Sequence, residues 1–176
     1  MDAKRREIAQ LGEPVLREVA RSVGGAITDE IQQLAQEMLL TLEDSGGVGL
    51  AAPQIFESTR LIVVASKPTK RYPYAPEIAP TVMLDPDFTP LTETLEKDWE
   101  GCLSIPGIRA LVPRYQRIKV SYRNLEGEQL NVELEGFVAR VFQHEYDHLN
   151  GMVYLDRVEN NRDIISEQAF FKLIAA

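Results

Sequence analysis

The chain has 176 residues, of which 44% are hydrophobic and 26% charged, a composition typical of a globular protein with enough apolar material for one core. One domain covering residues 1–176 is therefore expected. The 27 acidic and 19 basic side chains give a net charge of −8, which argues against DNA, or nucleic acid in general, as the default partner.

The chain begins with a basic stretch, residues 1–10, that lacks the apolar segment of a secretory signal, so export is not expected. The longest aliphatic run, residues 61–65, is much too short for a membrane helix. The single cysteine, Cys102, cannot form an internal disulfide. These features favour a cytoplasmic, bacterial-type protein without a membrane partner. A plastid or mitochondrial protein that has lost its transit peptide is the alternative.

Helical signals come first along the chain. Pro14 stands at a favourable helix start, so residues 13–23 predict a short helix. A stronger helix is predicted to begin after Thr28, a good N-cap residue, because apolar residues recur on one face up to Leu42. The glycine pair at 46–47 should end it.

The middle of the chain is rich in strand signals. Residues 61–66 and 81–84 predict buried strands, and the proline-bearing segment between them is expected to be an ordered loop. Apolar alternation in residues 117–123 is answered in residues 130–134 across a turn near Gly127, which predicts a hairpin.

Helical spacing returns in residues 137–149, where Gly151 is placed to end the helix, and a last amphipathic helix is expected from about Asn161 to the end. Helices segregated from antiparallel strands favour an α+β fold. The fold expected is therefore antiparallel sheets around a central helix over residues 137–149, with amino-terminal helices and a carboxy-terminal helix.

The two histidines of the chain, His144 and His148, stand four residues apart with Glu145 directly after the first. On a helix this spacing puts both imidazoles on one face, close enough to share a metal, and leaves a carboxylate beside it. Phe137 and Val141 fall on the same stripe. A pair of hydrogen-bonded core histidines is the structural alternative, but the combined pattern favours metal ligands.

A catalytic site of this kind needs a third protein ligand. Cys102 is the leading candidate, although a lone cysteine is more often a small buried hydrophobe. A thiolate with two imidazoles suits iron(II), zinc, nickel or cobalt better than magnesium or calcium.

A third segment, residues 46–54, combines three glycines and two alanines but lacks the ending of a phosphate-binding loop. Such a run permits close approach of a ligand to the backbone, or it is simply a helix end followed by a packed turn. Gln54 at its end offers an amide donor to a developing oxyanion, as does the backbone N–H after Cys102.

Residues 47–54, 100–104 and 143–148 together resemble the three ordered signature motifs of the peptide deformylase family. Residues 12–17 and 71–77 are also similar to members of that family, so the resemblance covers most of the chain. Only the stretch after about Val158 does not resemble members of the family.

The resemblance implies removal of the formyl group from the N-terminal formyl-methionine of new polypeptides, with release of formate. It also implies that one divalent metal, usually iron(II), is held by Cys102, His144 and His148. Glu145 would handle protons, while Gln54 and the Leu103 amide would bind the formyl oxygen. The nascent formylmethionyl peptide is the expected partner.

By the same resemblance the methionine side chain would enter a pocket lined by Val48, Leu103, Phe137 and Val141. The Gly49 backbone would pair with the extended substrate in strand fashion. Arg140 occupies a helix position where the family often has an apolar pocket residue, and we expect its stem to pack while its head reaches water.

Two other functions remain open on the motif alone. A metalloprotease of the His-Glu-x-x-His type would need a later carboxylate, Glu159 or Glu167, as its third ligand. A structural metal site in a ribosome-binding module would need four protein ligands and would leave Glu145 without a task.

The apolar stripe in residues 161–176 is expected to pack on the domain, because apolar helix faces usually serve a core. Docking at the ribosome near the exit of nascent chains is the alternative. The stretch has few basic residues, whereas phosphate-rich RNA prefers clustered lysine and arginine.

Overall fold

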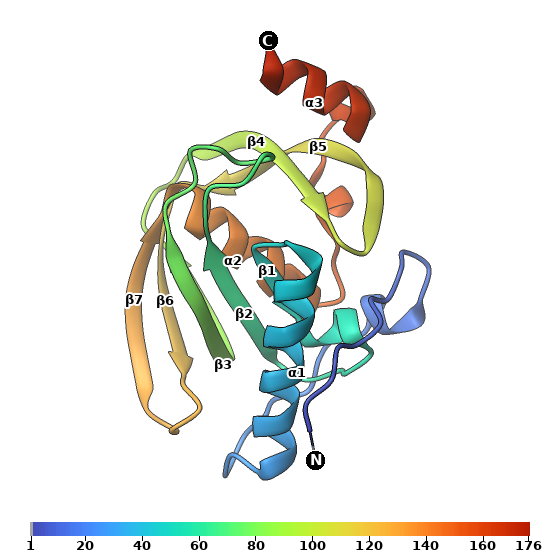
Figure 1. Cartoon of the computed structure of the whole chain (residues 1–176). Coiled ribbons are helices and arrows are strands. Elements are labelled where there is room, and N and C mark those ends of the chain that lie inside the picture. Colours follow the sequence, from blue (N-terminus) through green and yellow to red (C-terminus); the bar gives the residue numbers. More distant parts are fainter. Residues whose placement is uncertain (1) are drawn as a thin grey trace.

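The computed structural model describes residues 2–176, and Figure 1 shows two antiparallel sheets arranged around one helix. The sheets have five strands in the order β1-β2-β3-β6-β7 and three strands in the order β4-β5-β8. Within the described residues the α-helices are α1 (Asp29–Ser45), α2 (Gly136–Leu149) and α3 (Glu167–Ala175). The strands are β1 (Gly49–Ala51), β2 (Leu61–Ser66), β3 (Ile78–Pro90), β4 (Leu95–Cys102), β5 (Ile105–Tyr115), β6 (Arg117–Arg123), β7 (Gln129–Glu135) and β8 (Ile164–Ser166).

Helix α2 is the centre of the fold, because it contacts β1, β2, β6 and β7 of the large sheet and β5 of the small one. Most of its residues are buried, so it is covered on more than one side and has no broad solvent face. The predicted arrangement of antiparallel sheets around this helix is confirmed. The helix begins at Gly136, whose φ of 60° allows the chain to turn sharply out of β7.

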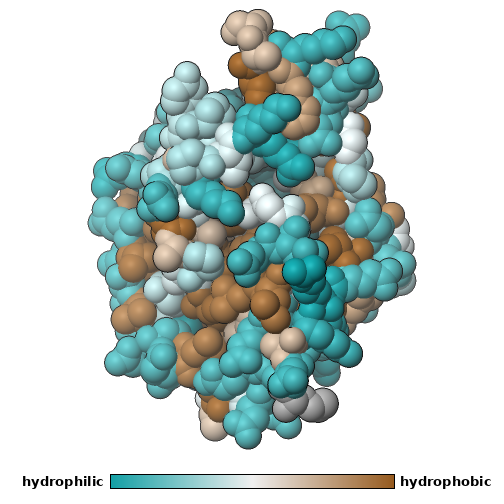
Figure 2. All heavy atoms as spheres, in the orientation of Figure 1, coloured by the Kyte–Doolittle hydropathy of each residue, from teal (hydrophilic) through white to brown (hydrophobic). Residues whose placement is uncertain are grey.

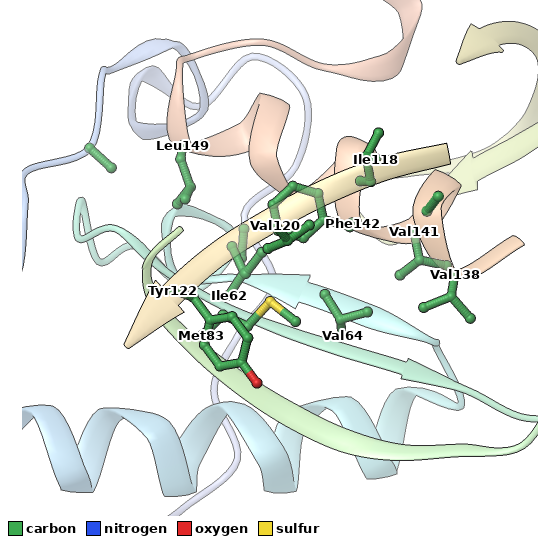
Figure 3. Close-up of a cluster of buried hydrophobic side chains, with 13 residues drawn as sticks. Ile62, Val64, Met83, Ile118, Val120, Tyr122, Val138, Val141, Phe142 and Leu149 are labelled. Carbon is green, nitrogen blue, oxygen red and sulfur yellow. The ribbon is translucent and has the colours of Figure 1, made fainter. Parts of the chain in front are cut away.

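Figure 3 shows how α2 is fixed to the large sheet. Phe142 on the helix points toward Ile62 of β2 and Val120 of β6, and these three side chains are fully buried. Fully burying each apolar side chain of this size contributes roughly 1.5–3 kcal/mol. The orientation of the helix, and hence of its polar residues, is set by this packing.

Helix α1 covers a second core that also includes β1 and β2. Its amino terminus is capped as the sequence predicts, since the Thr28 hydroxyl accepts a hydrogen bond from the Ile31 amide at 3.4 Å. Gly46 ends the helix with a φ of 68°, a left-handed conformation that favours glycine. The residues after it lead straight into β1, the edge strand of the large sheet.

The short helix predicted over residues 13–23 is wrong beyond its first turn, because only Pro14–Arg17 are helical, in a 3₁₀ turn. The chain then becomes extended, and the Ala20 amide donates to the Leu149 carbonyl at the end of α2. Long-range pairing with α2 therefore prevails over the local helical signal.

The predicted hairpin is confirmed as β6–β7, in which Val120 lies opposite Val132. The predicted strand over residues 81–84 is the middle of a longer strand, β3, that includes Pro80. The hairpin β4–β5 has no counterpart among the predicted elements. It pairs Glu100 with Ala110 and brings Cys102 opposite Ile105.

The last helix is shorter than predicted, because α3 starts at Glu167 and not near Asn161. The intervening residues form a 3₁₀ turn and β8, which pairs with β5. Phe170 is 2% exposed, but Leu173 and Ile174 are 53% and 38% exposed, so only part of the apolar stripe packs on the domain. Figure 2 shows this helix projecting at the top with apolar atoms on its surface.

No helix among residues 2–176 is long and apolar enough to cross a membrane.

Candidate metal centre and active site

Three potential metal-ligating side chains converge at the end of β4 and on α2. One donor atom from each of Cys102, His144 and His148 lies within 4.8 Å of the other two. The sulfur of Cys102 is 3.4 Å from His148 Nε2. The structure therefore brings the three predicted residues together, although the two histidines follow Cys102 by 42 and 46 residues in the sequence.

Glu100 holds the first histidine from behind. Its Oε1 lies 2.9 Å from His144 Nδ1. Because an ionised carboxylate can only accept, Nδ1 carries the proton and Nε2 is left as the free ring nitrogen. A carboxylate behind a histidine is the usual way to fix the tautomer and orientation of a metal ligand.

Two buried arginines hold Glu100 in turn. Arg114 donates to both carboxylate oxygens, at 2.9 and 3.0 Å, and Arg140 donates to one of them at 2.8 Å. Arg114 also donates to Asp147 on α2 at 2.6 Å. Burial alone would raise the pKa of Glu100, but the charge of Arg114 and the bond to His144 outweigh it, so the pKa lies well below its usual range.

The predicted placement of Arg140 is wrong, because its head does not reach water. The residue is 8% exposed, and its guanidinium also donates to the Val112 carbonyl at 2.7 Å and the Glu96 carbonyl at 2.8 Å. A buried guanidinium needs an anion and several acceptors nearby, and the small sheet supplies both. Arg140 thus lies against the pocket as part of the polar network behind it.

Glu145 has the environment of a proton-handling group. Its Oε2 is buried and has no hydrogen-bond partner within residues 2–176. Burial raises the pKa of Glu145 to about 7. The carboxyl lies against Gly49, where an added Cβ would come within 2.7 Å of Oε1.

Burial lowers the pKa of the other histidine, His148, well below its ordinary value. It therefore stays neutral, as a ligand must be. The donor set consists of one thiol and two imidazoles, and the unpartnered carboxylate oxygen of Glu145 lies on the residue after His144. Such a set fits one divalent metal of the softer kind.

Gln54 is fixed with its amide nitrogen toward the centre. Its Oε1 accepts from the Ala51 amide at 2.9 Å, so Nε2 points the other way, 3.5 Å from Cys102 Sγ and 3.2 Å from Ser104 Oγ. The 3₁₀ turn Ala52–Ile55 that carries Gln54 is completely buried. A rigid N–H donor therefore lies next to the metal-ligating side chains.

These groups open into one cavity of about 160 Å³. Cys102, His144, Glu145 and Gln54 line it, whereas His148 does not and reaches the cluster from the protein side. All of the other substrate and backbone positions that the sequence predicted also line this cavity, namely Val48, Gly49, Leu103, Phe137 and Val141.

Sequence reasoning assigned no role to the network of Glu100, Arg114 and Asp147, nor to Tyr72 and Arg109 at the cavity. One feature of the sequence could have identified Glu100 as part of the site. Glu100 stands two residues before Cys102, and alternate residues of a strand face the same side.

An HExxH helix with a cysteine in reach, enclosed by antiparallel sheets, defines a metal-dependent hydrolase. The family model described as polypeptide deformylase matches residues 5–163. The chain therefore belongs to the polypeptide deformylase family, whose enzymes remove the N-formyl group from nascent polypeptides.

Named relatives agree with this. The chain is 46% identical over 167 residues to "Peptide deformylase 2" of Nostoc sp., which covers 95% of this chain and 93% of the relative. Among solved structures, a Met-Ala-Ser-bound class I type b peptide deformylase from Acinetobacter baumannii is 39% identical, with a TM-score of 0.86 over 89% of this chain and 100% of that one. A Synechococcus elongatus peptide deformylase in complex with actinonin is 37% identical, with a TM-score of 0.79 over 93% of this chain and 87% of that one.

Proposed function

We propose that residues 1–176 form one catalytic domain that hydrolyses the formyl amide of N-terminal formylmethionine on nascent polypeptides. The products are formate and a free amino terminus. The observation that carries this proposal is the shared cavity of Cys102, His144, Glu145 and Gln54, in which the Glu145 carboxyl has a free, buried oxygen. Family membership supports the substrate class. Relatives in bacteria support action in the cytoplasm, where such chains emerge.

Cys102, His144 and His148 would hold one divalent cation, with iron(II) as the first choice. Zinc, nickel or cobalt would suit the same donors in purified preparations. When bound, the cation supplies a Lewis acid and lowers the pKa of water toward neutrality. The carboxylate of Glu100 keeps the His144 ring oriented with Nε2 free.

Glu145 is the proton carrier in this proposal. Its carboxylate accepts a proton from the attacking water and later gives it to the amine that leaves the formyl carbon. Its unpartnered Oε2 leaves one oxygen free for this exchange. A carboxyl whose pKa lies near neutrality can serve both as base and as acid.

Gln54 and the backbone N–H of Leu103 bind the formyl oxygen as it becomes negative. The bond from the Ala51 amide fixes the Gln54 carbonyl, so its NH₂ group is held on the side of Cys102. Preorganised donors of this kind are worth about 10² to 10³ in rate for each one removed.

Val48, Leu103, Phe137 and Val141 form the apolar surface for the methionine side chain. Gly49 is in β1, which is the edge strand of the large sheet, so its outer edge has backbone groups available to an extended peptide. An extended substrate added there would run past Glu145, which lies against Gly49.

The test compares three peptides of the same sequence: formyl-Met-Ala-Ser, acetyl-Met-Ala-Ser and unmodified Met-Ala-Ser. We expect formate from the first and no cleavage of any internal peptide bond. A metalloprotease would instead cut longer unformylated peptides. Absence of formate from enzyme whose iron content has been measured and found stoichiometric would refute the proposal.

A further inference from the structure

The carboxy-terminal helix takes part in the candidate active site, although it lies beyond the residues matched by the family model, 5–163. Its first residue, Glu167, lines the same cavity as the metal-ligating side chains. The helix is joined to the small sheet through β8, where Arg109 of β5 lies opposite Ile165. The position of Glu167 is therefore tied to the β5 strand next to Cys102.

Phe170 anchors the helix one turn further on. Its ring is 5.9 Å from that of Trp99 on β4, and the Arg109 guanidinium lies 5.5 Å from its centroid. Phe170 is 2% exposed, whereas Leu173 is 53% exposed. The start of α3 is thus firmly packed, and the end is not.

Arg109 connects the helix to the opposite side of the cavity. It donates to Glu167 Oε1 at 2.8 Å and to the Tyr72 hydroxyl at 3.1 Å. The Tyr72 ring is 4.7 Å from that of Phe137, one of the proposed methionine-pocket residues. A Cβ on Gly101 would collide with the Arg109 guanidinium, so this side chain lies directly over the residue before Cys102.

Three charged side chains, those of Arg71, Arg109 and Glu167, lie together at the rim of the cavity. Arg109 and Arg71 both line the cavity, and Arg71 Nε lies 3.7 Å from Glu167 Oε1. The side chains of Arg71 and Glu167 are 40% and 28% exposed, so a peptide leaving the cavity would experience their charge. With Glu167 ionised, the three groups carry one net positive charge, and without it they carry two.

We propose that α3 forms a wall of the substrate site and that Glu167 is a specificity-determining residue for the residue that follows formylmethionine. Its carboxylate offsets the charge of Arg109, so peptides with a basic residue after the methionine are accepted. It also holds Arg109 and Tyr72 at the rim of the methionine pocket. This inference rests on the proposed function and assigns a task to the part of the chain outside the family match.

The test uses Glu167→Gln, which keeps the size of the side chain and one oxygen for Arg109. Steady-state formate release is measured on formyl-Met-Asp-Ala and formyl-Met-Lys-Ala. We expect the ratio of kcat/KM for the acidic over the basic peptide to rise about two- to fivefold, as is usual for a partly exposed charge. The change should appear mainly in KM, because the reacting groups are untouched. Glu167→Lys should raise the ratio further.

Glu159→Gln is the matched control, since it removes the same charge from a residue that is 61% exposed, pairs with Lys97 and does not line the cavity. Its ratio should equal that of the parent. Dissociation constants of the product peptides Met-Asp-Ala and Met-Lys-Ala, measured by calorimetry, give a readout that is independent of turnover and should shift in the same direction.

The outcomes separate the two proposals. If the iron-loaded parent releases no formate from either peptide, the proposed function fails. If the parent is active but Glu167→Gln gives the same ratio and the same product affinities as Glu159→Gln, the role of Glu167 is refuted while the function stands. A rise confined to Glu167→Gln and Glu167→Lys supports the inference.

Discussion

Replacing Gly49 by alanine should damage the active site without touching any metal-ligating side chain. A Cβ built at this position would lie 2.7 Å from Glu145 Oε1, 2.9 Å from Val141 Cγ1 and 3.0 Å from Glu145 Cγ. Cβ atoms essentially never approach other atoms below 3.0 Å in real proteins. Gly49 is buried in β1, and Val141 is held in the core, so the Glu145 side chain has to move.

The size of the effect follows from this geometry. Overpacking a buried site by one methyl group costs about 1 to 3 kcal/mol of stability. For a chain of this length each kcal/mol lowers the melting temperature by about 2 to 4 °C, so a decrease of about 2 to 12 °C is expected. A shift of the carboxylate by about 1 Å should lower kcat by about 10²-fold, because proton transfer depends on close positioning.

Three measurements on Gly49→Ala test this reasoning: formate release, iron content and thermal unfolding. Iron content should stay at the parent level, because Cys102, His144 and His148 are not displaced. Gly47→Ala is a useful comparison, since its nearest contacts would be at 3.3 Å and its loss of stability should be smaller. If Gly49→Ala kept kcat within twofold of the parent, the close contact between Gly49 and Glu145 would have no role in positioning the carboxyl.

Four further predictions use the same assays. Glu145→Gln should keep its metal but lose about 10² to 10⁴ in rate, since an amide cannot accept the proton, and comparable formate release at equal iron content would contradict the role of Glu145. Cys102→Ser should bind iron(II) or zinc more weakly in a chelator competition, because an alcohol is much harder to deprotonate than a thiol, and full iron occupancy would exclude Cys102 as a ligand. Arg140→Met should lose about 2 to 4 kcal/mol in urea unfolding, because it removes one donor from the buried Glu100 carboxylate and another from the Val112 carbonyl, and Arg140→Lys should recover part of this stability. Hydrogen bonds from the backbone hold the pKa of Asp85 below 3.8 in spite of burial, so its contribution is present above that pH and is lost below it. The stability gap between the parent and Asp85→Asn should therefore narrow as the pH falls below about 3.8, and a constant gap down to pH 2 would be inconsistent with this.

The sequence predicts those elements whose apolar residues follow the period of their own secondary structure. Helix α1 and the hairpin β6–β7 bury one face each, so their patterns are regular and their predicted bounds lie close to those of the structure. The hairpin β4–β5 was missed because its buried positions include charged residues. Glu100, Arg109 and Arg114 are each at most 5% exposed, and a pattern that expects polar residues outside cannot detect a strand that buries them.

The site was predictable where chemistry restricts residue type and spacing. His144, Glu145 and His148 occupy one turn of a helix, so their proximity follows from local geometry alone. The contribution of Cys102 depends on how β4 pairs with β5, which local spacing does not specify. The placement of Glu167 depends on β8 adding to β5 more than fifty residues later in the chain, and no local pattern in the sequence contains that information.

The buried arginines around Glu100 explain why this carboxyl group stays ionised at the position where it bonds to His144. Glu100 and Asp147 carry two negative charges behind the site. Three guanidinium groups lie at hydrogen-bonding distance from them, since Arg114 and Arg140 bond to Glu100, and Arg114 and the partly exposed Arg157 bond to Asp147. The neighbouring guanidinium groups keep Glu100 ionised, so its Oε1 accepts a hydrogen bond from the Nδ1–H group of His144 and leaves the Nε2 lone pair free. A neutral side chain in place of Arg140 would remove one of the two guanidinium groups that bond to Glu100. Arg140 is therefore a second cation that favours the ionised form of the carboxylate behind His144.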